Sequence, residues 1–247
     1  DIRRSRGLGD VYKRQSHSRD HTEDLQFLPE VVTFPQSTAA VSAILKWAHA
    51  HNVPVTPAGG WTGLSGGALP VRGGISLSTK RLNSIVRIDE LNHQLLVQPG
   101  AIVQEMQEAV QAKGLFYAVD PASRGTCTIG GNLAENSGGP RAVKYGVTKD
   151  WVLNLEVVLS DGTVIRTGAD TLKNSTGYNL TQLMVGSEGT LGIITEATLK
   201  LLPWPKFNAL LLVPFADPAK ACQAVAGLFV DGNQPLLCCM HAGLQRR

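Results

Sequence analysis

The sequence is poor in cysteine and has no long apolar run. Its four cysteines form no Cys-x-x-Cys pair and are Cys127, Cys222, Cys238 and Cys239. That spacing suits neither a zinc site nor a disulfide framework, so each is expected to be a small buried apolar residue in a reducing compartment. No apolar run approaches the roughly 18 residues that a membrane-spanning helix needs. We therefore expect a cytoplasmic protein with no transmembrane segment, and peripheral association at the inner membrane is the alternative.

The excess of basic charge is confined to the N-terminus. Residues 1–15 carry 5 basic and 2 acidic side chains, an excess equal to the +3 net charge of the whole chain. The remainder is neutral, so neither nucleic acid nor an anionic membrane surface is expected as a partner. Residues 10–15, DVYKRQ, resemble the translation of a transposase-end sequencing adaptor. We interpret residues 1–15 as adaptor-derived and exclude them from fold reasoning, with a natural basic arm as the alternative.

Hydrophobic spacing predicts strands and helices without regular alternation, which favours an α+β fold over a doubly wound sheet. Ser37 is a plausible N-cap for a helix that ends by His51-Asn52. Further helices are predicted over 102–113 and 180–184. Strands are predicted over 31–33, 53–55, 75–78, 84–89, 94–97, 151–160, 164–167 and 192–202. After Pro205 a new unit is expected, with a strand over 209–213, a helix from Asp217-Pro218 to Phe229 and a strand at 236–237.

Residues 57–67, PAGGWTGLSGG, hold 5 glycines directly after a predicted strand. Glycine allows positive φ and a close approach of backbone N–H groups to a phosphate, and the hydroxyls of Thr62 and Ser65 can add donors. The segment is neither a G-x-G-x-x-G that opens a helix nor a Walker loop, because no Lys-Ser/Thr pair follows Gly67. Taken alone, it leaves an anion-binding loop and a surface turn open.

Two further segments combine glycine with amide or β-branched side chains. In residues 120–139, DPASRGTCTIGGNLAENSGG, one helical turn over 131–136 would bring Asn132 and Asn136 onto one face. Neutral amides suit the polar edge of a heterocycle, and a capped turn with solvated amides is the alternative. Residues 186–195, GSEGTLGIIT, enter a β-branched strand from glycine, which indicates bare backbone beside a ligand or a tight hairpin.

Four stretches in this order, TGLSGGALP, CTIGGNLAENSGG, KYGVT and GSEGTLGIITEATLKLLPWP, resemble one superfamily. It is the p-cresol methylhydroxylase and vanillyl-alcohol oxidase superfamily, in its branch of glycolate oxidase large subunits, D-lactate dehydrogenases and D-2-hydroxyglutarate dehydrogenases. The resemblance runs from His17 to Pro205. It implies an FAD-binding domain of two α/β subdomains over 16–205, followed by the truncated start of an α+β substrate or cap domain over 206–247.

The resemblance also implies which residues hold FAD. Those expected at the pyrophosphate are Ala58, Gly59, Gly60, Trp61, Thr62, Gly63 and Ser65. Those expected along the isoalloxazine and ribityl groups are Pro121, Ser123, Thr128, Gly130, Gly131, Asn132, Asn136 and Gly138. Those expected at the adenine side or the pyrophosphate are Glu188, Gly192 and Ile193.

Two positions depart from the pattern of the superfamily. Ala58 stands where many relatives carry Arg, so backbone amides are expected to carry more of the anion stabilisation. Trp61 stands where covalently flavinylated relatives carry the histidine that bonds the flavin. Indole cannot form that bond, so FAD is expected to be held non-covalently. Trp61 itself is interpreted either as packing on the cofactor or as a core aromatic.

The implied reaction is oxidation of a D-2-hydroxy acid, of the glycolate or D-lactate type, by hydride transfer to flavin N5. No ligand spacing, and hence no metal site, is evident among the six histidines, which are His17, His21, His49, His51, His93 and His241. All six are interpreted as structural or solvated. The catalytic acid–base group is expected beyond residue 247, so that this chain alone is expected to be inactive.

Other polar residues and other functions stay open at this stage. Arg141 is a candidate for binding the substrate carboxylate, because its guanidinium can form two parallel hydrogen bonds to a carboxylate. The pairs Lys144–Tyr145 and Lys173–Tyr178 are interpreted as exposed lysines near partly buried phenols. The electron acceptor is open. The alternatives are a flavin-binding module or subunit completed by a partner chain, and a non-redox flavoenzyme of the ether-lipid synthase type.

Overall fold

The computed structural model describes residues 14–22, 24–209, 211–233 and 235, so most of the segment interpreted as adaptor lies outside them. Its strands are β1 (Val31–Thr33), β2 (Val55–Ala58), β3 (Ile75–Ser78), β4 (Ile85–Asp89), β5 (Gln94–Val97), β6 (Leu115–Phe116), β7 (Val152–Val158), β8 (Val164–Arg166), β9 (Ile193–Lys200) and β10 (Leu202–Pro203). Its α-helices are α2 (Thr38–Ala50), α3 (Val103–Gln111), α4 (Ile129–Glu135), α5 (Ala142–Tyr145), α6 (Leu180–Met184) and α7 (Pro218–Val230). Two short 3-10 helices are η1 (Thr79–Arg81) and η2 (Thr148–Trp151).

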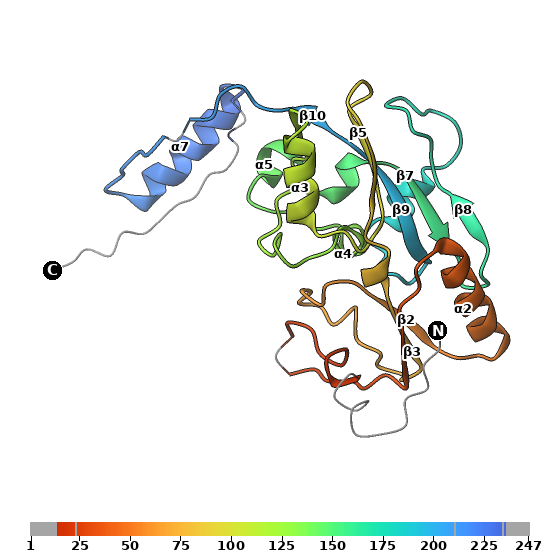
Figure 1. Ribbon diagram of the computed structural model, residues 1–247. Coiled ribbons are helices and arrows are strands. Elements are labelled where there is room, and N and C mark those ends of the chain that lie inside the picture. Colours follow the sequence, from red (N-terminus) through yellow and green to blue (C-terminus); the bar gives the residue numbers. More distant parts are fainter. Residues whose placement is uncertain (1–13, 23, 210, 234, 236–247) are drawn as a thin grey trace.

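A three-stranded parallel sheet with the order β1-β3-β2 forms the smaller part of the molecule (Figure 1). The helix α2 begins at the predicted N-cap, where the hydroxyl of Ser37 accepts from the N–H of Ala40 at 3.2 Å. The strand predicted over 53–55 is shifted and begins at Val55. The reason is that the N–H of Val53 donates to the last turn of α2 and so belongs to the end of the helix. β2 therefore runs into the first residues of the glycine-rich segment.

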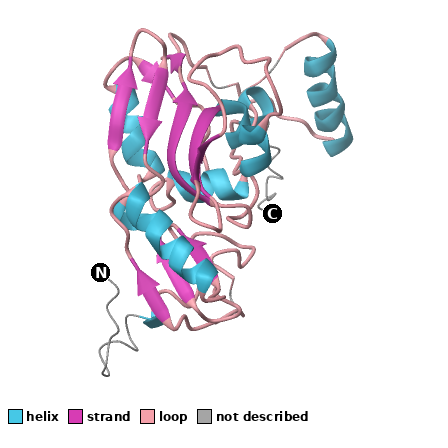
Figure 2. Cartoon of the chain, turned by 90° about the vertical axis from the view of Figure 1, so that its right-hand side faces the viewer, coloured by secondary structure: helices cyan, strands magenta, loops and turns pink. Residues whose placement is uncertain are grey.

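A five-stranded antiparallel sheet with the order β4-β5-β9-β7-β8 forms the larger part. Figure 2 shows this sheet with helices against one face. α3 and α4 contribute Met106 and Leu133 to the same buried cluster as Leu95 of β5 and Leu199 of β9. The hairpin predicted around Asp161-Gly162 is confirmed as β7 and β8. A parallel and an antiparallel sheet in one chain confirm the α+β class.

A second, smaller hydrophobic cluster joins the two sheets. It comprises residues of α2, β3, β7 and β9 and the residue after η1, namely Val41, Leu45, Leu77, Leu82, Val158 and Ile193. Hydrogen bonds tighten the same junction, because the Thr38 hydroxyl donates to Glu156 at 2.7 Å and the Ser42 hydroxyl donates to the carbonyl of Gly162 at 2.5 Å. The two sheets therefore share buried surface and are not independent modules.

The predicted strand over 192–202 is divided in two. Ile193–Lys200 pairs inside the large sheet, whereas Leu202–Pro203 pairs with β6. The strand predicted over 209–213 does not form at residues 209 and 211–213, which are exposed. No described strand pairs with them, and an unpaired apolar strand has no ladder to stabilise it.

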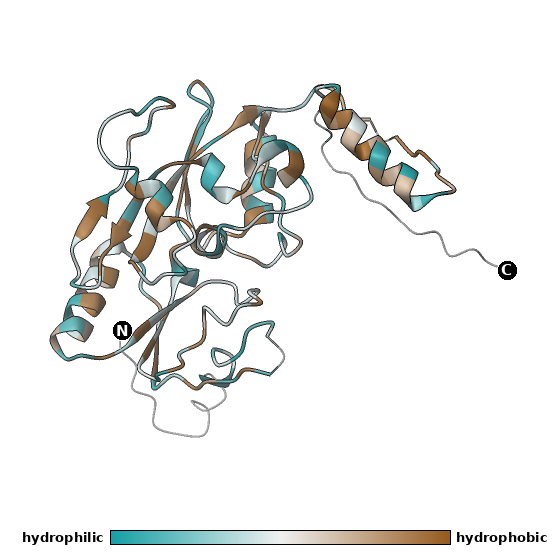
Figure 3. Cartoon of the chain, turned by 180° about the vertical axis from the view of Figure 1, so that it is seen from behind, coloured by the Kyte–Doolittle hydropathy of each residue, from teal (hydrophilic) through white to brown (hydrophobic). Residues whose placement is uncertain are grey.

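The helix predicted to begin at Asp217-Pro218 is confirmed as α7, with the Asp217 carboxylate as its N-cap. No residue of α7 is buried, and Figures 1 and 3 show this helix, with its hydrophobic residues, apart from both sheets. Cys222 on α7 is consequently exposed, contrary to the prediction, whereas Cys127 is buried as predicted. The remaining predictions for this end, at 236–237, Cys238, Cys239 and His241, lie outside the described residues.

No helix within the described ranges is long and apolar enough to cross a bilayer. The domain bounds 16–205 and 206–247 remain predictions.

Two leucines of the same β4–β5 hairpin test the position of the core. Leu95 is 0% exposed and Leu91, in the turn, is 95% exposed. Leu95→Ala should lower the free energy of unfolding by about 2–5 kcal/mol, because it leaves a cavity in the main core. Leu91→Ala should change it by less than about 0.5 kcal/mol. Urea denaturation followed by circular dichroism measures both, and equal effects would contradict the packing described.

Candidate functional site

The three segments singled out in the sequence meet at one pocket. β2 and β3 are parallel, with Ala58 paired to Ser78, so their carboxyl ends lie side by side. The glycine-rich segment leaves the end of β2 and meets the first turn of α4 and the loop that precedes β9. The residues that line the pocket are Pro57, Ala58, Gly59, Gly67, Ala68, Thr79, Pro99, Gly130, Gly131, Ala134, Glu135, Ser187, Glu188, Gly189, Gly192, Ile193 and Ile194.

Glycine is required at this meeting point because neighbouring residues lie too close to leave room for a Cβ. A Cβ on Gly60 would lie 2.8 Å from the carbonyl oxygen of Thr126, and one on Gly59 would overlap the Thr128 hydroxyl. A Cβ on Gly130 would meet Pro99 at 2.5 Å, and one on Gly189 would overlap the ring of Pro57. The loop after β2 is thus stacked on both other segments. The walls of the pocket are largely main chain, which leaves N–H groups near any ligand.

Trp61 occupies an unusual backbone position in the glycine loop. Its φ of 55° is in the left-handed region, which a bulky residue rarely adopts. The indole is 9% exposed and its ring centre lies 4.7 Å from that of His17, edge on. Its Nε1 is buried without a hydrogen-bond partner among the described residues. A strained backbone and a buried donor without a partner are both features of functional positions, so Trp61 is a candidate for a role beyond packing.

α4 presents the two asparagines differently from the prediction. Thr128 caps the helix by accepting from the N–H of Gly131 at 3.3 Å, and Asn132 is 3% exposed. The Nδ2 of Asn132 is buried without a partner among the described residues. Asn136 instead terminates the helix in the left-handed conformation and accepts from the N–H of Lys149 at 2.9 Å. The oxygen of Asn136 therefore has a structural role, whereas the buried amide donor of Asn132 is unused.

Two carboxylates stand at the mouth of the pocket. Loss of hydration raises the pKa of Glu135, and the nearby charge of Glu188 raises it further. The Ser65 hydroxyl opposes this effect by donating to the Glu135 carboxylate at 3.3 Å, so it is engaged there and not directed to a phosphate. The charge of Asp20 adds a smaller upward contribution to the pKa of Glu135. The mouth is therefore electronegative.

The structure places some predicted site residues in the pocket lining and others outside it. Those on the wall are Ala58, Gly59, Gly130, Gly131, Glu188, Gly192 and Ile193. Those that are not part of the lining are Gly60, Trp61, Thr62, Gly63, Ser65, Pro121, Ser123, Thr128, Asn132, Asn136 and Gly138. Among the residues that sequence reasoning missed, Glu135 and Gly189 lie inside the quoted motifs. No local sequence signal marks Thr79 or Pro99. Thr79 reaches the pocket because β3 pairs with β2, and Pro99 reaches it through its contact with Gly130.

The remaining polar candidates lie elsewhere. Arg141 forms an ion pair with Asp120 at 3.3 Å, so its guanidinium already has a carboxylate. Lys144 is exposed beside a half-buried Tyr145 as predicted, whereas Lys173 and Tyr178 are both exposed. No histidine lines this pocket. Within the described ranges, no group of three or more His, Cys, Asp or Glu residues is placed to hold a metal ion.

Comparison with known proteins agrees with this geometry. A family model described as an FAD binding domain matches residues 29–168. The glycolate oxidase subunit GlcD of Bacillus subtilis (strain 168) is 48% identical over 215 residues, covering 87% of this chain and 46% of that protein. A D-lactate dehydrogenase of Anaerostipes hadrus is 42% identical over 207 residues, covering 84% of this chain and 43% of that protein. A solved structure of an alkyldihydroxyacetonephosphate synthase superposes with a TM-score of 0.78 at 27% identity, covering 91% of this chain and 43% of the other.

The chain belongs to this FAD-binding domain family, and its cofactor is FAD. It spans less than half the length of each of the relatives named above. The lining of the pocket fits this cofactor. It is mostly glycine, alanine and proline, and a Cβ at Gly59, Gly130 or Gly189 would overlap a neighbouring residue, so the main chain can approach a ligand closely there. Trp61 and Asn132 lie outside the lining, and each holds a buried donor without a partner among the described residues, for which the phosphate and carbonyl oxygens of FAD are suitable acceptors.

Gly60 provides the sharpest test of the backbone stacking. Gly60→Ala should push the loop away from residues 126–128 and raise the dissociation constant of FAD about tenfold or more, through lost backbone hydrogen bonds. Gly227→Ala on α7, where a Cβ would meet nothing within 4 Å, is the matched control and should leave FAD affinity unchanged. Titration of the apoprotein with FAD, followed by flavin fluorescence, measures both. Unchanged affinity in Gly60→Ala would contradict the stacking.

Proposed function

We propose that this chain is the FAD-binding part of a flavin-dependent oxidoreductase that oxidises a D-2-hydroxy acid of the glycolate or D-lactate type. The observation that carries the proposal is the convergence of three separate segments on one backbone-lined pocket. The 48% identity to a glycolate oxidase subunit and 42% identity to a D-lactate dehydrogenase support the substrate class.

Residues of this chain would hold and orient the cofactor. The glycine loop from Gly59 to Gly63 would offer backbone N–H groups, and Trp61 and Asn132 would offer side-chain donors. The first turn of α4 would instead support the loop by packing, because the N–H groups of residues 129–132 already have acceptors within the protein. When bound, FAD supplies a hydride acceptor for the oxidation of the alcohol. Removal of the hydroxyl proton needs a base, and the lining of this pocket includes no histidine. We therefore expect the acid–base group, and the cation that orients the substrate carboxylate, to come from outside this pocket.

A second candidate is a non-redox flavoenzyme of the ether-lipid synthase type. The similarity to a solved alkyldihydroxyacetonephosphate synthase, with a TM-score of 0.78, favours it. Identity to that protein is only 27%, against 48% for the glycolate oxidase subunit, so the oxidoreductase remains the first proposal. A flavin module completed by a partner chain is compatible with either chemistry.

FAD should be dissociable. Trp61 offers no nucleophile to the flavin from the glycine loop, so no covalent bond is expected at that position. The absorbance spectrum of the FAD-loaded protein should show flavin bands that pass wholly into the supernatant after acid precipitation. Flavin retained in the pellet would reveal a covalent link, and failure of the folded protein to bind added FAD would overturn the proposed function itself.

Whether this domain supports oxidation of a D-2-hydroxy acid is tested by placing its residues 16–205 in the Bacillus subtilis glycolate oxidase subunit, in place of the matching segment. Anaerobic addition of glycolate or D-lactate should bleach the flavin of the chimera, whereas L-lactate should not. The present chain loaded with FAD serves as the comparison and should stay oxidised, because its pocket lacks an acid–base histidine. A chimera that holds FAD but is reduced by no D-2-hydroxy acid would favour the non-redox alternative.

A further inference from the structure

The pocket poses an electrostatic problem for an anionic ligand. Residues 57–67 contain no Lys or Arg, while Glu135 and Glu188 both line the pocket. The raised pKa of Glu135 shows that the region already disfavours negative charge. FAD carries an ionised diphosphate between its two ring systems. Backbone N–H groups alone would have to hold that anion beside two carboxylates, so a nearby cation is needed to balance the charge.

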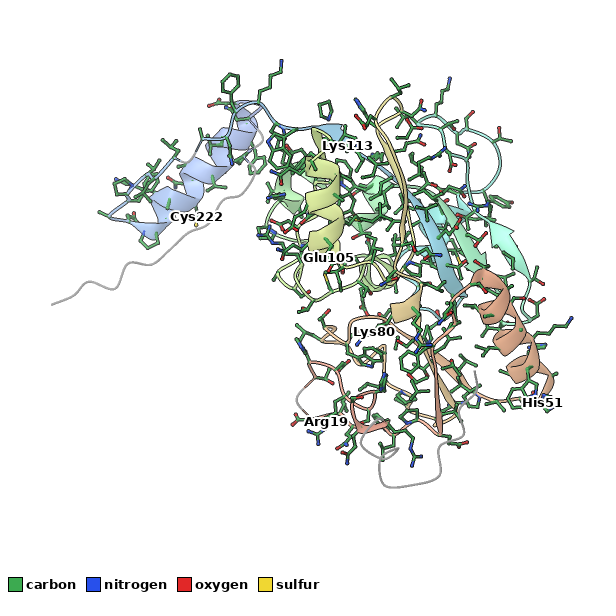
Figure 4. The ribbon with its side chains drawn as sticks, viewed as in Figure 1. Arg19, His51, Lys80, Glu105, Lys113 and Cys222 are labelled. Carbon is green, nitrogen blue, oxygen red and sulfur yellow. The ribbon has the colours of Figure 1, made fainter. Side chains whose placement is uncertain are left out.

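Lys80 is a cation whose side chain reaches the glycine loop. Its ammonium nitrogen lies 4.7 Å from the centre of the Trp61 ring. Chain topology explains this contact, because η1 begins where β3 ends and β3 pairs with β2, from which the loop departs. Figure 4 shows Lys80 at the junction between the part with the small sheet and the part with the large sheet. The preceding residue, Thr79, lines the pocket and donates its hydroxyl to the carbonyl of Ala58 at 3.3 Å.

The charge of Lys80 is available to a ligand. It forms no ion pair with any residue that the structure describes, in contrast to Lys113, Arg124, Arg141 and Arg166. Its ammonium contacts the face of the indole, which attracts a cation without neutralising it. The contact with Trp61 restricts the position of the exposed Lys80 ammonium. The ammonium keeps its full charge and can bind a second partner.

We propose that Lys80 binds the diphosphate of FAD, with Trp61 as the positioning residue that holds its ammonium over the glycine loop. This inference rests on the proposed function, that the domain holds FAD. It gives the strained conformation of Trp61 a role, since the left-handed φ of 55° sets the indole under the ammonium. It also explains how a loop without a cation of its own can hold an anion beside Glu135 and Glu188.

The neighbouring Arg81 provides a matched control. It carries the same charge one residue further on, but its guanidinium lies 5.6 Å from the ring of Phe34. Removing either charge changes the net charge of the protein equally. A difference in FAD affinity between the two variants therefore reports the position of the charge and not the overall field.

The experiment titrates the apoprotein with FAD in wild type, Lys80→Gln, Lys80→Arg and Arg81→Gln, and follows flavin fluorescence at low and high salt. Lys80→Gln should raise the dissociation constant about tenfold or more and flatten its salt dependence. Lys80→Arg should stay within about threefold and Arg81→Gln within about twofold, since each keeps the cation at the loop. ADP, which shares the diphosphate, should compete with FAD less well in Lys80→Gln by a similar factor.

The outcomes separate this proposal from the proposed function. If wild type binds FAD and Lys80→Gln weakens binding no more than Arg81→Gln, the role of Lys80 is wrong while the FAD domain stands. If Lys80→Arg is as weak as Lys80→Gln, the side chain acts by shape and not by charge, and the proposal again fails. If folded wild type, checked by near-ultraviolet circular dichroism, binds no FAD, the proposed function falls first.

Discussion

The constraint on which the pocket depends is close contact at glycines, where no space is left for a side chain. Gly60 lies against residues 126–128, Gly130 against Pro99, and Gly189 against Pro57. A side chain at Gly60 would separate the loop after β2 from residues 126–128. One at Gly130 would separate α4 from the chain after β5, and one at Gly189 would separate the loop before β9 from β2. The two sheets hold these segments close together. β2 belongs to the three-stranded sheet and β9 to the five-stranded sheet, and the smaller hydrophobic cluster joins the two sheets. The fold thus brings the main chain of three segments that are distant in the sequence to one pocket.

A pocket built in this way has a consequence for charge. Main-chain N–H groups are partial charges, and they must act here beside Glu135 and Glu188. The loop itself carries no cation, so the compensating charge has to come from a neighbouring element. Parallel pairing of β2 and β3 provides the route, because it brings the residues after β3 next to the loop after β2. The same pairing explains why Thr79 lines the pocket although the sequence separates it from the loop.

Much of the fold follows from local sequence patterns. Ser37 as an N-cap, the Asp161-Gly162 turn and the strand at 75–78 were predictable because each depends on neighbours within a few residues. The three glycine segments were likewise visible, and the structure brings them together. What could not be predicted depends on contacts between residues far apart in the sequence. The hydrogen bond from Ser65 to Glu135 and the presence of Thr79 and Pro99 in the pocket lining are of this kind, and so is the left-handed end of α4 at Asn136. The strand predicted over 209–213 is wrong at its described residues, because an apolar segment forms a strand only where another strand is present to pair with it.

The composition of the pocket also indicates where substrate choice resides. Glycine, alanine and proline make up most of its lining, and such residues select the outline and charge of a cofactor through the backbone. They offer few side chains with which to distinguish one hydroxy acid from another. Relatives whose names indicate different substrates can therefore share this domain at 42–48% identity, and a synthase of another kind can share the fold at 27%. Discrimination between their reactions must then come from groups outside this lining, while this domain holds the cofactor.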